Sequence, residues 1–121
     1  MKKPVGCSSY HEWEVKELRE DREFAVEYLI AAMEALDDPD ERGGGLLALR
    51  AVAEAYGGLG AVAAQAGISR ESLYRSLSSK GNPTLKTLVA VLKTLGLRLS
   101  IADRQQAEAT QAKQGDDYAA A

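Results

Sequence analysis

Hydrophobic positions recur at helical spacing along most of the chain, and polar residues that cap or stop helices divide them into stretches. The first stretch follows Asp21, a residue type that caps helix N-termini, and stops at the Asp-Asp-Pro of residues 37–39. Its spacing predicts an amphipathic helix of about four turns. Burial of its stripe in a core is favoured over a partner-facing surface, because wide apolar stripes rarely stay exposed. The apolar positions are Phe24, Tyr28, Leu29, Ala32, Met33 and Leu36.

The same spacing predicts two more core helices. We interpret Gly43–Gly45 as a joint, because no Lys-Ser or Lys-Thr pair follows, as a phosphate-binding loop requires. The helix after it ends at Gly57 and Gly58, and its apolar positions are Leu46, Leu49, Ala53 and Tyr56. The last helix is capped by Thr84 and ends at Gly96, and its apolar positions are Leu85, Leu88, Leu92 and Leu95.

Between these helices, the chain has the features of two short helices joined by a tight turn. Gly67 can adopt the left-handed conformation at which helices end, and Ile68 fills the space between the two helices. Ser69 is a good N-cap for the second helix, on which Leu73 and Leu77 form the buried stripe. A helix-turn-helix is therefore predicted, with an exposed face that fits a DNA major groove. That face carries Arg70, Glu71, Tyr74 and Arg75.

After Gly96 the periodicity changes from helical to strictly alternating, at Leu97, Leu99 and Ile101. This predicts a short strand without a clear partner in the chain. It can pair with residues 12–16, with its own copy in a dimer, or with the sheet edge of another protein. We expect a homodimer that uses the three alternating apolar residues, because helix-turn-helix proteins read two-fold operators.

The two ends of the chain show weaker patterns. In residues 10–18, Trp13, Val15 and Leu18 interleave with charged residues, which fits either an extended segment or the start of a helix. We expect a flexible N-terminal arm over residues 1–20, an amphipathic helix over 21–42, a DNA-binding domain over 43–101 and a disordered tail over 102–121.

Charge is distributed unevenly around the net value of −3. Residues 59–101 contain six cations and one acid, whereas residues 1–58 contain seven cations and thirteen acids. A basic module beside an acidic one suggests two partners of opposite charge, and an ordinary solvated surface is the alternative.

The composition argues against catalysis. The chain has one histidine, His11, and one cysteine, Cys7, so it offers no nucleophile–base pair, no zinc-ligand cluster and no disulfide. We expect no enzymatic activity and no cofactor. No apolar run of about 18 residues and no cleavable signal segment is present, so we expect a cytoplasmic protein that does not enter a membrane.

Three stretches carry a family resemblance: REFAVEYLIAAMEA, LALRAVAEAYGGLGAVAAQAGISRESLYRSLSSKGNP and TLVAVLKTLGLRLSI. Over about Trp13 to Ile101 the chain resembles the HigA-like addiction-module antidote proteins, which are antitoxins with a lambda-repressor-like (Cro/C1, XRE) helix-turn-helix. The resemblance implies an all-α lambda-repressor-like bundle with an N-terminal helical arm, and the alternating segment allows a short C-terminal strand.

The resemblance also implies partners. Such a chain binds and neutralises a small toxin, similar to the RelE and HigB ribonucleases and encoded beside it, and represses the shared operon as a dimer on double-stranded operator DNA. An RNA-cutting toxin should be basic, because its substrate is a polyanion. A stand-alone repressor, or a toxin-inhibiting module with little DNA binding, is the alternative.

Carried over residue by residue, the resemblance places base readers in the second helix of the motif and backbone contacts in the loop after it. The predicted DNA-binding residues are Ser69, Arg70, Glu71, Ser72, Tyr74, Arg75, Lys80, Asn82 and Lys86. One position departs from the pattern: many relatives place Thr-Gln at the start of the first helix, where the Gln contacts phosphate, and this chain has Gly58-Leu59. Backbone amides at that helix start can still hold a phosphate.

For the toxin, the acidic N-terminal part is the preferred surface. Its apolar residues are more numerous than a passive linker needs, and aromatic side chains commonly act as binding hot spots. The predicted partner-binding residues are Trp13, Val15, Leu18, Phe24 and Tyr28.

Overall fold

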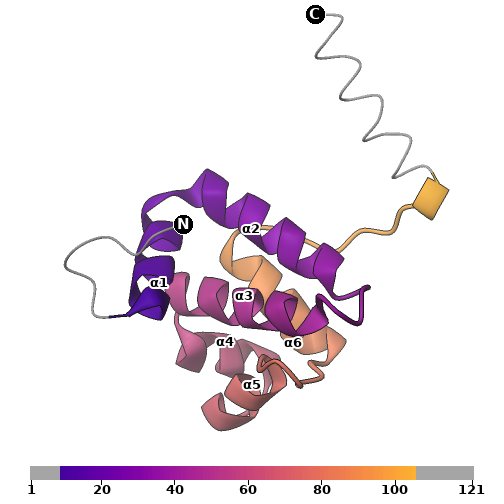
Figure 1. Cartoon of the computed structure of the whole chain (residues 1–121). Coiled ribbons are helices and arrows are strands. Elements are labelled where there is room, and N and C mark those ends of the chain that lie inside the picture. Colours follow the sequence, from indigo (N-terminus) through magenta and orange to yellow (C-terminus); the bar gives the residue numbers. More distant parts are fainter. Residues whose placement is uncertain (1–8, 106–121) are drawn as a thin grey trace, which may run out of the picture.

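The computed structural model describes residues 9–105, and all regular structure within them is α-helical, as predicted (Figure 1). The central helix is α3, which packs against α1, α2, α4 and α6. Within the described residues no single helix is long and apolar enough to span a membrane. Helices α3 and α4 taken together have the length and composition of a membrane span, but a bend of 106° separates them. The elements are α1 (Tyr10–Glu20), α2 (Arg22–Ala35), α3 (Arg42–Ala55), α4 (Leu59–Ala66), α5 (Arg70–Ser76) and α6 (Leu85–Thr94).

Side-chain caps set where four of these helices begin. Asp21 accepts a hydrogen bond from the backbone N–H of Phe24 at 3.1 Å, and Ser69 and Thr84 make the corresponding bonds at the starts of α5 and α6. These three caps confirm the sequence prediction. A fourth, Ser9, caps α1 in the same way. Each cap satisfies a backbone N–H that the first turn of a helix leaves unpaired.

Helix α1 corrects the expectation that residues 1–20 form a flexible arm. Residues 10–20 are helical, and Trp13, Val15 and Leu18 are buried, with Leu18 completely inaccessible. Helix α1 packs mainly against α3, and the hydroxyl of Tyr56 donates to the carbonyl oxygen of Leu18 at 2.6 Å. The rest of the predicted arm, residues 1–8 with Cys7, and residues 106–121 of the predicted tail lie outside the described residues.

The glycine triplet is part of α3 and not a joint between elements. Gly45 is buried where α2 crosses α3, and a Cβ added there would lie 2.7 Å from the carbonyl oxygen of Ala32 and 3.0 Å from the Cβ of Ala35. Gly44, one residue earlier, has nothing within 4 Å of the same position. The triplet therefore includes a residue on which the closest contact between α2 and α3 depends.

In α6 the buried face is rotated from the one predicted. Leu92 and Leu95 are buried, as expected, but Leu85 is 66% exposed. Thr87 and Val91 take its place in the core, and the Thr87 hydroxyl is paired with that of Thr84 at 3.1 Å. The threonine can be buried because its polar atom has a partner.

The alternating segment does not form the strand that was expected. Its first residue, Leu97, donates its N–H to the carbonyl of Leu92 at 3.0 Å and is half-buried, but Leu99 is 40% and Ile101 99% exposed. Residues 12–16, one of the pairing partners considered, lie in α1. Because a strand needs a paired neighbour, the alternation alone does not produce one in the described chain.

Gly45 and Gly44 offer a matched test of the α2–α3 contact. We expect Gly45→Ala to lower the free energy of unfolding by about 1–3 kcal/mol, because its methyl group overlaps the backbone of α2. Gly44→Ala should leave stability unchanged or raise it by up to about 1 kcal/mol, because alanine favours helix and the site is open. Urea denaturation of both variants measures the difference, and equal stabilities would contradict the role of Gly45.

Candidate nucleic-acid interface

A left-handed glycine joins α4 to α5. Gly67 has φ 71° and ψ 29°, and the N–H of Ile68 donates to the carbonyl of Ala63 at 3.0 Å, which closes the end of α4. Ile68 is half-buried against the core, so the chain leaves the turn in a fixed direction. The predicted turn residues are confirmed at both positions, because their conformations are determined locally.

Two leucines fix the orientation of α5. Leu73 and Leu77 have no exposed surface, which places this side of α5 in the core. The opposite side exposes Arg70, Glu71 and Arg75, and Tyr74 is 48% exposed. The structure therefore brings the predicted base-reading side chains together on one solvent-facing surface, which we call the α5 face.

The start of α5 adds polar groups to this face. The Ser69 hydroxyl accepts from the N–H of Ser72 at 3.0 Å, and the two hydroxyls are 2.9 Å apart. The guanidinium of Arg75 donates a hydrogen bond to the Ser72 hydroxyl at 3.4 Å. All members of the α5 face belong to one helix and its cap.

The loop between α5 and α6 folds back on the end of α5. A Cβ at Gly81 would lie 2.1 Å from the carbonyl oxygen of Ser76, so only glycine fits this approach. Lys80 precedes this contact and is exposed, and Asn82 accepts a hydrogen bond from the guanidinium of Arg42 at 3.2 Å. Lys86 reaches the turn at Gly67, where its Nζ would be 3.1 Å from an added Cβ.

Arg50 of α3 is a contributor that the sequence reasoning missed. Its guanidinium lies over the ring of Tyr74, 4.3 Å from the ring centroid, which is a cation–π contact. Beside it, a groove of about 320 Å³ is lined by Glu54, Leu59, Arg70, Glu71 and Tyr74. Spacing along α3 places Arg50 outside the buried stripe, but nothing local indicates that it reaches α5.

The start of helix α4 carries Gly58 and Leu59, where the family pattern has Thr-Gln. Gly58 is the N-cap, with φ 85° and ψ 155° and no side-chain cap, and Leu59 is 6% exposed. Leu59 is therefore a core residue, and no side chain at this position reaches outward. The N–H groups of Gly60 and Ala61 lie in the first turn of α4, where no side chain caps them.

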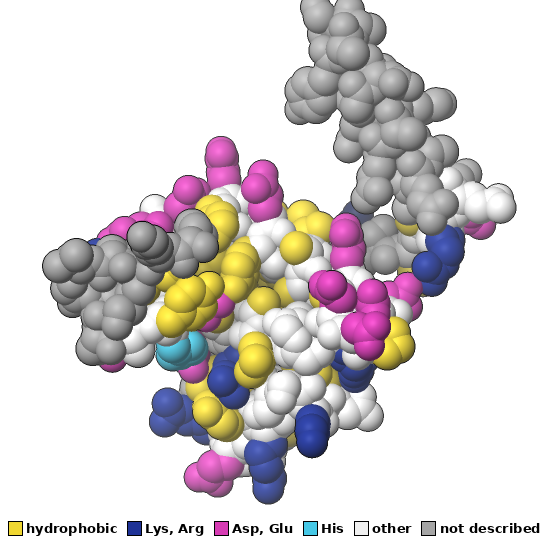
Figure 2. All heavy atoms as spheres, viewed as in Figure 1, with side chains coloured by type: hydrophobic (Ala, Val, Ile, Leu, Met, Phe, Trp, Pro, Cys, Tyr) yellow, Lys and Arg dark blue, Asp and Glu magenta, His cyan; other side chains and the backbone are white. Residues whose placement is uncertain are grey.

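Charge is separated across the molecule. Figure 2 shows basic side chains gathered at the end formed by α5, and acidic side chains over α2 and the loop after it. The charged residues on α2 are mostly acids, whereas α5, the loop after it and the start of α6 carry Arg70, Arg75, Lys80 and Lys86 against Glu71. This arrangement favours a polyanion at the α5 face.

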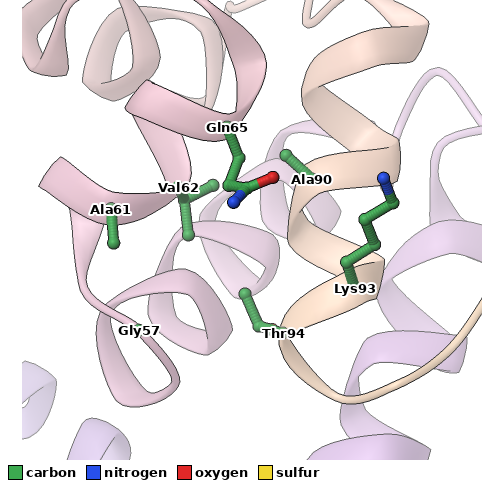
Figure 3. Close-up of a pocket in the computed structure, with 7 residues that line it drawn as sticks. All are labelled: Gly57, Ala61, Val62, Gln65, Ala90, Lys93 and Thr94. Carbon is green, nitrogen blue, oxygen red and sulfur yellow. The ribbon is translucent and has the colours of Figure 1, made fainter.

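A second groove, of about 280 Å³, lies between α4 and α6 (Figure 3). Gln65 points into it from α4, facing Ala90 and Thr94 of α6. Lys93 and Thr94 are its other polar lining residues, and the Thr94 hydroxyl donates to the carbonyl of Val91 at 2.6 Å. The described residues contain no group of three or more potential metal ligands. The groove therefore does not change the assignment of the α5 face as the candidate site.

The residues expected to bind a partner through the N-terminal part are mostly core residues. Trp13, Val15 and Leu18 are buried, so they present no exposed anchor, which corrects that prediction. Phe24 and Tyr28 are half-buried and pack against each other with ring centroids 5.5 Å apart. Burial first, and then the hydrogen bond to Glu14, raise the pKa of the Tyr28 hydroxyl above its ordinary value.

The contact between Arg50 and Tyr74 can be measured by a double-mutant cycle. We expect Arg50→Ala and Tyr74→Ala to be coupled by about 0.5–1 kcal/mol in the free energy of unfolding, because each removes the same cation–π contact. The control cycle pairs Tyr74→Ala with Arg98→Ala, for which additive effects are expected. Additive effects in the first cycle as well would show that the contact contributes nothing in solution.

Comparison with known proteins agrees with the resemblance stated from the sequence. A family model described as "Probable addiction module antidote protein" matches residues 9–103. An "Uncharacterized protein" of Haemophilus influenzae is 50% identical over 40 residues, which are 33% of this chain and 41% of that protein. No solved structure matches significantly. Since the family model spans well over half of the sequence, the chain belongs to the family of probable addiction module antidote proteins.

Proposed function

We propose that the chain is the antitoxin of a type II toxin–antitoxin module. It binds and neutralises a small basic RelE/HigB-like toxin, and it represses its own operon by binding operator DNA as a homodimer. The observation that carries the DNA-binding part is the α5 face, a set of polar and basic side chains held outward by the buried Leu73 and Leu77. Membership of the antidote family supports the toxin-binding part.

In this proposal α4 and α5 act as a helix-turn-helix with α5 in the major groove. Arg70 and Arg75 read guanine, because a guanidinium can donate two hydrogen bonds to its major-groove edge, and each such pair contributes roughly 1–3 kcal/mol of discrimination. Lys80 and Lys86 contact phosphate, which adds affinity without sequence information. Ser69, Ser72 and Asn82 supply further polar contacts beside them, and Tyr74 offers its half-exposed ring.

A second candidate is a toxin-inhibiting module with little DNA binding. It is favoured by Leu59, which is buried at the position where many relatives carry a phosphate-binding Gln. The uncapped N–H groups at the start of α4 act against this alternative, because the N-terminus of a helix attracts phosphate. The two candidates differ in whether a specific operator is bound.

DNA binding is tested with a duplex from the promoter of this gene and a scrambled duplex of equal length. We expect Arg70→Ala and Arg75→Ala to weaken promoter binding by about tenfold or more and scrambled binding much less, because base contacts are lost. Lys80→Ala should weaken binding to both duplexes alike, and the salt dependence of the affinity should fall by the amount expected for about one phosphate contact. Lys93→Ala, an exposed cation of α6 outside the α5 face, is the control. Fluorescence anisotropy at several salt concentrations measures all four.

Toxin binding is tested with the small protein encoded beside this gene. We expect the full chain to restore growth when it is co-expressed with that protein, and to form a stable complex with it on gel filtration. Arg75→Ala should neutralise as well as the wild type, because the α5 face is reserved for DNA. Unchanged growth arrest and no complex would contradict the antitoxin assignment, whatever the result with DNA.

A further inference from the structure

An apolar groove lies between α2, the end of α6 and the segment after it. Its volume is about 400 Å³, and its rim includes Ile30 and Leu99, which are 47% and 40% exposed. Next to it, Ile101 is 99% exposed. Figure 1 shows the segment leaving α6 and passing along α2. The lining residues are Leu29, Ile30, Met33, Glu34, Leu92, Leu97, Arg98, Leu99 and Ser100.

The backbone along one side of this groove is unpaired within the described residues. After the N–H of Leu97, which closes α6, no hydrogen bond joins the backbone of residues 98–100 to any other described residue. This segment also alternates apolar and polar side chains, as the edge of a sheet does. An extended segment of another chain can therefore pair with it by strand addition and place alternate side chains in the groove.

The helix on the other side of the groove is acidic. Glu23, Glu27 and Glu34 share a helical face with Ile30, because the four positions are separated by steps of three or four residues. All three carboxylates are exposed, and no ion pair engages them within the described part of the chain. Arg98 is the one basic side chain among the lining residues, and Arg104 pairs with Asp37 at 2.9 Å near the end of α2.

This charge distinguishes two occupants. In a two-fold dimer through the groove, the same acidic helix of both copies would border one interface, and like charges brought together there oppose association. A basic partner has the complementary charge. Attraction to the acidic helix would raise the association rate of such a partner above that of a neutral one, while apolar contacts with Ile30, Leu99 and Ile101 supply the affinity.

We propose that this groove is the docking site of a basic protein chain, which lays an extended segment along residues 98–101. The inference rests on the proposed function, in which that chain is the toxin. It moves the toxin surface from the buried Trp13, Val15 and Leu18 of α1 to the groove between α2 and α6, and it gives Leu97, Leu99 and Ile101 a role other than dimerisation.

The test measures binding of the protein encoded beside this gene to the full chain by biolayer interferometry. We expect Ile30→Glu and Leu99→Glu to weaken the complex by at least about tenfold, because each places a charge in the apolar groove. Leu85→Glu, which changes an exposed leucine at the start of α6, is the matched control and should bind as the wild type does. Glu27→Gln should lower the association rate and its salt dependence, whereas Glu20→Gln at the end of α1 should not.

Each outcome decides the inference. Equal binding by the wild type and the groove variants overturns the docking site and leaves the antitoxin assignment intact. Absence of binding by the wild type overturns the antitoxin assignment, and the docking site with it. If Leu99→Glu turns a dimer into a monomer in sedimentation while toxin binding is unchanged, the occupant is a second copy and the inference is wrong. Melting temperatures confirm folding, and Ile101→Glu, at a 99% exposed position, replaces any variant that unfolds.

Discussion

The close approach of α2 and α3 at Gly45 is the contact on which the rest of the structure depends. A helix with a side chain at this position could not come so near the backbone of Ala32. Once α2 is seated, α3 buries residues on most sides, and α1, α4 and α6 pack around it. Helix α3 is thus the common support for the acidic half of the molecule and for the basic half that carries α5.

Two sets of contacts hold the α5 face in place. Leu73 and Leu77 anchor one side of a helix of only seven residues, which would not be stable alone. Arg50, one partner of the Tyr74 ring, belongs to α3, so the same helix that organises the core also contacts the exposed face. The short helix α5 gains a fixed orientation in this way, and a fixed orientation is what the proposed reading of base edges requires.

Separation of charge gives the two ends of the molecule different preferences. The α5 face attracts a polyanion, whereas the acidic side of α2 repels one and attracts a cationic surface (Figure 2). Partners of opposite charge can then occupy opposite ends without competing for the same side chains. The groove beside α2 adds apolar surface to the acidic end, and apolar contact determines how long a complex lasts more than charge does.

The sequence by itself determined the features that depend on neighbouring residues. The caps at Asp21, Ser69 and Thr84 and the left-handed turn at Gly67 were predictable, because each is a bond or conformation within a few residues. Helical periodicity likewise indicated α2, α3 and α6, and the spacing of Leu73 and Leu77 was enough to identify the exposed side of α5.

Only the tertiary structure decided what depends on contact between distant segments. It placed Gly45 against α2, made Trp13 a core residue and brought Arg50 over Tyr74. Spacing along one helix cannot reveal these contacts, since it defines a face but not the neighbour that covers it. Alternation at residues 97–101 likewise could not reveal whether a pairing strand is present, and a strand forms only where a second strand shares its hydrogen bonds.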